Sequence, residues 1–171
     1  MARTLREQIG KRDGFRSLEE EAMLNVYRTA SHLGGPERAL FKEFNLSSAS
    51  YNLLRILRGH HLAGEAQGVR ASGIGCEMVV RMPDVTRLVD RLVEMKLVER
   101  GDDACDKRVK YVRITKKGLG VLDELDGLVD QMVHDRLGHL SKAQLKELSR
   151  LLELVRNEDG DGRGAKKKGS A

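Results

Sequence analysis

Residues Met82 to Gly118 read MPDVTRLVDRLVEMKLVERGDDACDKRVKYVRITKKG, the most informative stretch of this chain. Its first part predicts an amphipathic helix, because apolar residues recur there at the i, i+3, i+4, i+7 spacing. These residues are Val85, Leu88, Val89 and Leu92. Two β-like runs follow, Leu97 to Arg100 and Val109 to Thr115, joined by the charged turn Gly101 to Arg108. A helix followed by a hairpin with a basic tip predicts a winged helix, whose helix fits the major groove of DNA while the hairpin covers neighbouring phosphates and the minor groove.

The order and spacing of residues in this stretch form a longer pattern. It reads V-T-R-L-V-D-R-L-x-x-x-x-L-V-x-R, then D-x-R, then I-T-x-x-G, at Val85 to Leu92, Leu97, Val98, Arg100, Asp106, Arg108, Ile114, Thr115 and Gly118. The pattern resembles the signature of MarR-type (multiple antibiotic resistance) transcriptional regulators, and the order of helices extends the resemblance from about Ser17 to Arg156. It implies a mainly α fold with a small β-hairpin wing, a winged helix-turn-helix with N- and C-terminal dimerisation helices.

Composition excludes several classes of protein. The 171 residues fit one domain with an attached oligomerisation element, and the low aromatic content of 4% without Trp predicts an aliphatic core. No apolar run approaches the ~20 residues of a membrane span, and the N-terminus lacks an apolar secretory core, so we expect a cytoplasmic protein without a membrane partner. Two cysteines without a CxxC pair argue against a disulfide framework and a structural zinc site.

Positive charge is concentrated in the predicted winged helix and at the two termini. The net charge is +5, and residues 81–117 hold eleven Lys and Arg against seven Asp and Glu. Residues 1–16 and 156–171 are also basic, whereas the segments between them are slightly acidic. This distribution is typical of a protein that neutralises phosphates. A merely solvated surface explains Lys166, Lys167 and Lys168 equally well.

Capping residues and composition divide the chain into five segments. These are a basic N-terminal arm (1–16), N-terminal helices for dimerisation (17–46), the winged helix-turn-helix (47–117), C-terminal helices for dimerisation (118–157) and a disordered basic tail (158–171). In the first half, Ser17 and Glu20 form a capping box that predicts a helix ending before Gly34-Gly35-Pro36. A short helical piece, Glu37 to Phe44, and a helix capped by Ser47 or Ser48 that ends near Arg58 are expected next.

The expected elements continue around the wing. His60 to Gly68 is predicted to be a loop, and Ser72 to begin a short helix that reaches about Val80, although Gly73 and Gly75 weaken it. Lys96 stands where the family usually has Gly, at a position that tends to need positive φ and would cost Lys roughly 1 kcal/mol. After the wing, Thr115 can cap a long helix to about Leu137, and a second capping box, Ser141 with Gln144, opens the last helix.

The last helix predicts a homodimer. Its apolar residues spread over a broad face, and nothing else in the sequence is obviously left to cover them. These residues are Leu145, Leu148, Leu151, Leu152 and Val155. A two-fold dimer would bind double-stranded DNA at a palindromic operator with half-sites about 10 bp apart. The alternative is an ordinary core helix buried within its own chain.

Several polar residues are candidates for direct DNA contact. Arg87 and Arg91 lie four apart on the polar face of the predicted recognition helix, where a guanidinium can bind guanine in a bidentate manner. Thr86 can donate to a phosphate or contact a thymine methyl group. Arg91 can alternatively brace Asp90 or the wing. Ser72, at the start of its expected helix, can cap that helix and contribute to an anion site.

The family resemblance assigns roles within the wing. It implies that Arg108 is the wing-tip arginine that enters the minor groove, where narrow A·T-rich segments concentrate negative potential. Asp106 is expected to fix Arg100 or Arg108 through a charge-assisted hydrogen bond. Lys107 and Lys110 are expected to contact phosphates and add affinity without sequence information.

The resemblance also implies a small-molecule effector, typically a phenolic or lipophilic anion that releases DNA from the protein. The residues that could line its cleft are Tyr27, His32, Tyr51, Arg55 and Arg58. The simpler alternative is a tyrosine whose hydroxyl is satisfied within a helical interface.

The sequence offers little support for other chemistry. Cys76 is expected to be buried and inert, and Cys105, in the wing, is a weaker redox candidate because three aspartates surround it. The five histidines show no metal-ligand spacing, and no phosphate loop, metal triad or nucleophile–base constellation is present, so we expect no cofactor and no enzyme activity. The predicted function is a dimeric, effector-responsive transcriptional regulator, most simply a repressor. The alternative is a winged-helix architectural or protein-interaction module without strong sequence specificity.

Overall fold

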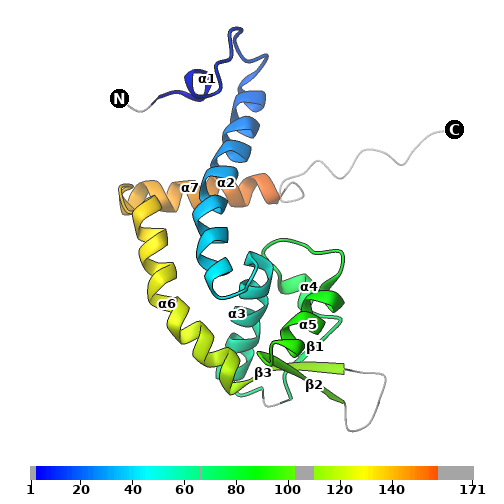
Figure 1. Cartoon of the computed structure of the whole chain (residues 1–171). Helices are drawn as coiled ribbons and strands as arrows, with labels where there is room; N and C mark the ends of the chain where they lie inside the picture. The colour runs from blue at the N-terminus through cyan, green and yellow to red at the C-terminus, as the bar shows by residue number, and fades with distance from the viewer. Residues whose placement is uncertain (1–2, 66, 103–109, 158–171) are drawn as a thin grey trace, which may run out of the picture. The chain divides into compact units, whose positions relative to one another are not determined.

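The computed structural model describes residues 3–65, 67–102 and 110–157, shown as coloured ribbon in Figure 1. The helices are α1 (Leu5–Gln8), α2 (Leu18–Glu43), α3 (Ser48–Leu62), α4 (Ile74–Glu77), α5 (Val85–Glu94), α6 (Lys116–Leu137) and α7 (Lys142–Arg156). The strands are β1 (Val69–Arg70), β2 (Val98–Asp102) and β3 (Lys110–Ile114). The chain divides into two compact units, residues 1–129 and 130–171, with the boundary inside α6. The predicted mainly α fold with a β-hairpin wing is confirmed.

The N-terminal arm contains a helical turn that the sequence analysis did not predict. Thr4 caps α1, and the Thr4 N–H donates to the Glu7 carboxylate at 2.8 Å, so the two residues form a complete capping box. Leu5 is buried, which anchors this turn. The capping box satisfies two amides that a helix start otherwise leaves without partners, so even four residues can form a turn here.

Helix α2 is one continuous helix, and the predicted end before Gly34 is wrong. Ser17 caps it by accepting the Glu20 N–H at 3.2 Å, but the Glu20 carboxylate accepts the N–H of Arg16 rather than that of Ser17. Pro36 lies inside the helix, where it removes one backbone hydrogen bond at a cost of ~3 kcal/mol. The helix continues because Phe41, almost fully buried, anchors its C-terminal part in the core, and tertiary packing outweighs local propensity.

Helix α3 crosses the centre of the first unit. Ser47 is its cap and accepts the Ser50 N–H at 3.1 Å. Leu53, Leu54 and Leu57 are fully buried, so α3 supplies much of the core. The predicted loop from His60 is wrong at its start, because α3 continues to Leu62, four residues past the expected end at Arg58.

The sheet has three antiparallel strands in the order β1-β3-β2. The predicted hairpin is β2 and β3, with Val98 opposite Ile114 and Asp102 opposite Lys110. Strand β1 was not predicted, because two residues are too short to show a period-2 pattern. It pairs Val69 with Val112, and its chain enters through Gly68, which has φ +85°. A Cβ at Gly68 would lie 2.4 Å from the Val112 carbonyl oxygen, so this close approach requires glycine.

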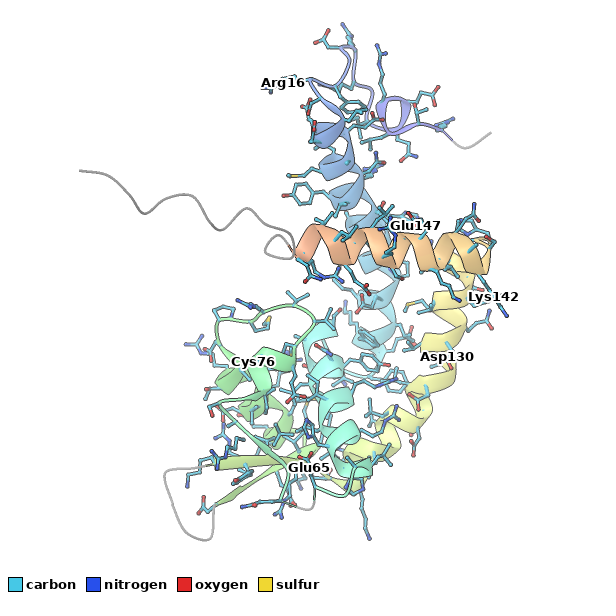
Figure 2. All side chains as sticks on the ribbon, turned by 180° about the vertical axis from the view of Figure 1, so that it is seen from behind. Arg16, Glu65, Cys76, Asp130, Lys142 and Glu147 are labelled. Atoms are coloured by element: carbon cyan, nitrogen blue, oxygen red, sulfur yellow. The ribbon has the colours of Figure 1, made fainter. Side chains whose placement is uncertain are left out.

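Helix α4 is shorter than predicted and begins later. Ser72 is not its N-cap: Gly73 holds that position, and no side chain caps the helix. The low helix propensity of Gly73 and Gly75 accounts for the single turn. Ile74 is fully buried, whereas Cys76, two residues later, points to solvent, so the prediction of a buried Cys76 is wrong (Figure 2).

Helix α5 confirms the predicted amphipathic pattern. Its apolar face is buried through Leu88, Val89 and Leu92. Asp84 caps the helix by accepting the Arg87 N–H at 3.0 Å. At its end Lys96 has φ +61°, so the conformation that usually requires glycine is present here with lysine.

The residues of the I-T-x-x-G pattern join the wing to helix α6. The Thr115 hydroxyl donates to the Lys96 carbonyl at 2.8 Å and accepts the Gly118 N–H at 3.0 Å, which confirms Thr115 as a cap. A Cβ at Gly118 would lie 2.2 Å from the Leu97 carbonyl oxygen. Glycine is therefore needed where α6 passes the start of the wing.

The second unit is small and helical. Ser141 and Gln144 form the predicted capping box at the start of α7. None of the residues of α7 is buried, and its larger apolar side chains remain substantially exposed. Among the described helices of the whole chain, none has the length and apolar character needed to span a membrane.

Candidate nucleic-acid interface

The polar face of α5 carries the side chains predicted to contact bases. Thr86, Arg87 and Arg91 are all exposed on it. The Arg87 Nε lies 3.0 Å from the Asp84 carboxylate, while the side chain as a whole is 88% exposed. Asp84 therefore orients Arg87 without covering it, and the outer edge of the guanidinium stays accessible for a bidentate contact.

Arg91 has a structural partner that neither predicted alternative included. Its guanidinium donates to the Asn45 carbonyl at 3.2 Å, so it joins α5 to the turn after α2. Asn45 has φ +57°, a conformation that asparagine adopts more readily than most residues. This contact favours a bracing role for Arg91 and leaves Arg87 as the better candidate for a base contact.

An ion pair joins the recognition helix α5 to strand β2 of the wing. Asp90 of α5 lies 2.6 Å from the Arg100 guanidinium of β2. Asp106 was expected to fix Arg100 or Arg108, but Asp106 and Arg108 lie outside the described residues, and Arg100 is held by Asp90. Both side chains are partly exposed, so the pair adds little stability, and its main effect is to set the orientation of α5 relative to the hairpin.

Cross-strand ion pairs continue along the hairpin. Lys110 pairs with Asp102, and Arg113 lies 3.2 Å from Glu99, as expected from the antiparallel register. Lys110 is exposed and stays near the wing tip, where a phosphate contact was predicted, although Asp102 partly neutralises it. Lys107 and Cys105 lie outside the described residues.

Ser72 does not occupy the predicted anion-binding position. It is exposed in the turn between β1 and α4, one residue before the N-cap. A helix of four residues has little macrodipole, so the geometry does not support the proposed anion site.

Three of the five predicted effector residues, Tyr51, Arg55 and Arg58, lie close together, but they form hydrogen bonds with one another and with Asp126 of helix α6. Arg58 binds Asp126 through two hydrogen bonds of 2.7 and 2.8 Å, and Arg55 donates to Asp126 at 3.3 Å and to the Tyr51 hydroxyl at 3.1 Å. The hydrogen bonds from Arg58 hold the pKa of Asp126 below its usual value. Arg58 also lies 3.5 Å from the Asp123 carboxylate, so the two arginines are paired with two carboxylates of α6 rather than left free for an anionic effector.

Asp126 is a functional candidate that the sequence analysis missed. It lies 68 residues from Arg58, and no spacing motif connects the two positions. The other two predicted residues, Tyr27 and His32, are exposed along α2 and take no part in this network.

His60 joins α3 to α4 and to the turn after α3 through its two ring nitrogens, an arrangement that we call the histidine tie. His60, near the end of α3, lies 2.8 Å from Glu65 through Nδ1 and 2.8 Å from Glu77 through Nε2. Glu77 is the last residue of α4, and Glu65 lies in the turn after α3 (Figure 2). The hydrogen bonds to Glu77 and Glu65 raise the pKa of His60. Within the described ranges, no cluster of His, Cys, Asp and Glu has the arrangement of a metal site.

Comparison with known proteins places this geometry in context. A MarR transcription factor from Planctomyces limnophilus, whose crystal structure is known, is 38% identical in sequence to this chain. Its structure matches with a TM-score of 0.62, and the match covers 82% of this chain and 99% of that one. The transcriptional repressor IacR of Pseudomonas putida is 28% identical over 116 residues, which are 68% of this chain and 66% of IacR, just under two thirds of that relative.

A more distant neighbour shares the fold. BpsR of Bordetella bronchiseptica, whose DNA binding is regulated by 6-hydroxynicotinic acid, matches with a TM-score of 0.71 over 84% of this chain and 99% of its own, at 18% identity. At this identity the likeness shows the fold alone. No protein-family model matches the chain.

Proposed function

The chain belongs to the MarR family of transcription factors, and on this premise we propose that it is a homodimeric repressor that binds a palindromic operator and is controlled by a small molecule. The observation that carries the proposal is the arrangement of α5. The apolar face of α5 is buried, and Arg87 is exposed on its opposite face. Asp90 joins α5 to the wing through its ion pair with Arg100. Such a helix can enter the major groove while the hairpin lies against the flanking backbone.

Residue roles follow from this placement. Arg87 and Thr86 are proposed to contact bases, and Lys110 a phosphate. Lys107 and Arg108 are proposed to extend the contacts of the wing to phosphates and the minor groove. Residues 47–117 form the DNA-binding part in this proposal, whereas 17–46 and 118–157 form the dimer.

Dimerisation is proposed from the uncovered apolar faces of α2 and α7. In α7 the predicted residues Leu148, Leu151 and Val155 are exposed together with Leu154, while Leu145 and Leu152 are half-buried. In α2 the exposed apolar residues include Met23 and Val26. A second copy of the chain supplies the same faces in return, which is the basis of a two-fold interface. The two winged helices would then meet two half-sites about one helical turn apart.

The closest support for repression and effector control comes from the relatives themselves. IacR is named a repressor, and the DNA binding of BpsR is regulated by a small molecule. A regulator of this kind acts on DNA in the cytoplasm and performs no catalysis.

The test is binding of the purified protein to DNA from its own upstream region, followed by fluorescence anisotropy across a salt series. We expect one dimer per palindrome and a preference of about 10³ or more over random DNA. Arg87→Ala should relax the preference at one position in each half-site, and Arg108→Ala should weaken operator binding. Lys142→Ala, which removes an exposed cation outside the winged helix, is the matched control. Weak binding that is indifferent to sequence and to Arg87 would instead support an architectural or protein-interaction role.

A further inference from the structure

A cavity lies beside the segment that leads into the recognition helix. Its volume is about 490 Å³, and it is bounded by the C-terminal part of α2, the start of α3 and residues 78–82. This volume is in the range of ~300–1,000 Å³ that small-molecule sites occupy. The walls are largely apolar, as ligand pockets usually are, and the lining side chains include Ala49, Tyr51, Met78, Val79 and Val80.

The outer wall of the cavity is an apolar segment with uncovered side chains. Val79 is 86% exposed and Val80 is 67% exposed, although both are strongly apolar. The backbone of this segment is nonetheless held, because the Val79 N–H donates to the Asn52 side-chain oxygen at 2.8 Å. Uncovered apolar side chains on a fixed backbone are typical of a binding surface.

The charge of the cavity selects the class of ligand. Glu37 contributes a carboxylate, and none of the lining residues that the structure describes is a lysine, arginine or histidine. Arg81, in the same segment, is exposed and does not line the cavity. Arg55 and Arg58 are bound to Asp126, and Arg55 also donates to the Tyr51 hydroxyl, but neither arginine lines the cavity. An anion would therefore meet no cationic side chain among these lining residues, whereas a cation would have the Glu37 carboxylate.

We propose that this cavity binds a lipophilic cation, with its apolar groups against the valines and methionines and its charge beside Glu37. The regulatory part of this inference rests on the proposed function. Only Pro83 separates residues 78–82 from Asp84, which caps α5, so a ligand that moves this wall moves the start of the recognition helix. An occupied cavity then lowers the affinity of α5 for its operator. The ligand class is the opposite of the lipophilic anion that the family resemblance implies.

The test uses two probes of the same shape and opposite charge, tetraphenylphosphonium and tetraphenylborate. Isothermal titration calorimetry with the full chain should show one saturable tetraphenylphosphonium site per protomer and at least tenfold weaker binding of tetraphenylborate. Glu37→Gln should weaken tetraphenylphosphonium about tenfold and remove the preference between the probes. Glu43→Gln removes an exposed carboxylate from the same helix without lining the cavity, so it should bind both probes like the unaltered protein.

A second variant separates the cavity from charge effects at the surface. Ala49→Leu adds volume inside the cavity and should weaken both probes while circular dichroism shows a folded protein. Equal or tighter binding of tetraphenylborate, or unchanged tetraphenylphosphonium binding to both variants, would overturn the proposed site.

Operator binding is measured in the presence and absence of the same probes. This separates a failure of the proposed cavity site from a failure of the proposed DNA-binding function. Release of operator DNA by tetraphenylphosphonium, absent in Glu37→Gln, supports regulation through this cavity. Charge-selective probe binding without release of bound operator supports the site and overturns its regulatory role. Failure to bind any operator without probe overturns the proposed function, while calorimetry still decides the site.

Discussion

Helices α5 and α7 are both amphipathic, but only α5 covers its apolar face within its own compact unit. Leu92 of α5 is fully buried, whereas Leu151, in the corresponding stripe of α7, is 46% exposed. The apolar face of α5 therefore holds the domain together and leaves its polar face free for DNA. The apolar face of α7 contributes little to its own protomer and is available for a second copy.

The largest expected effect is the loss of stability when a side chain on the buried apolar face of α5 is truncated. Leu92→Ala removes a fully buried side chain and should lower the free energy of unfolding by about 3 kcal/mol, through lost burial and the cavity left behind. Urea denaturation measures this change. Leu62→Ala makes the same deletion at an exposed position and should cost under ~0.5 kcal/mol. Similar costs for the two variants would contradict the contrast between covered and uncovered leucines.

A substitution on the uncovered apolar face of α7 should weaken the dimer. Leu151→Asp should raise the dimer dissociation constant by at least 100-fold, about 2.7 kcal/mol, because it places a charge inside the apolar interface. Sedimentation equilibrium measures the dissociation constant, and operator affinity should fall with it. Lys146→Asp introduces the same side chain on the opposite face of α7, by helical periodicity, and should leave the dimer intact. A dimer that tolerates Leu151→Asp would place the interface elsewhere.

The polar side of α5 should affect DNA binding with little change in stability. Asp90→Asn removes the ion pair with Arg100 and should lower operator affinity about 3- to 10-fold, because α5 is then less firmly oriented relative to the wing. The pair is partly exposed, so unfolding should change by under ~1 kcal/mol. Combining Asp90→Asn with Arg100→Gln isolates the coupling, since the double variant should be little worse than either single one. Additive losses would show that the two residues act independently.

The smallest effect concerns the histidine tie between α3 and α4. The pKa of His60 is raised in the folded protein by its hydrogen bonds to Glu77 and Glu65, so the protonated form stabilises the fold. This stabilisation is complete below pH ~6.5, the unfolded value, and is lost as pH rises through the higher folded value. Arg55 lines the same surface hollow as His60, Glu65 and Glu77.

Urea denaturation between pH 5.5 and 8.5 tests the tie. The expected contribution is under ~1 kcal/mol, because all three side chains are partly exposed. His60→Gln should remove this part of the pH dependence. His139→Gln replaces an exposed histidine of the second unit and should preserve it. An unchanged pH profile in His60→Gln would show that the tie carries no stability.

Most features that depend on neighbouring residues were predicted correctly, although Ser72 is not a cap and Glu20 does not complete the capping box at Ser17. The caps at Ser141 and Thr115 follow from side chains within a few positions of one another, whereas the positive φ of Lys96 was expected from the family resemblance. The apolar period of α5 is likewise a local pattern. Two of the failures have a common cause, which is that packing can overrule local preference. Burial of Phe41 carries α2 through Pro36, and Val112 gives β1 a partner although β1 itself is only two residues long.

Local patterns in this chain are sufficient to predict a winged helix, a recognition helix with Arg87 on its polar face, and a terminal helix with an apolar face to cover. They cannot assign partners across the fold. Arg58 with Asp126 and Asp90 with Arg100 meet only after the helices and strands have packed. The same is true of the cavity beside Glu37, whose walls come from three separate segments. Backbone propensity and periodicity act over a few residues, whereas charge pairing and cavity shape depend on distances that only the tertiary structure sets.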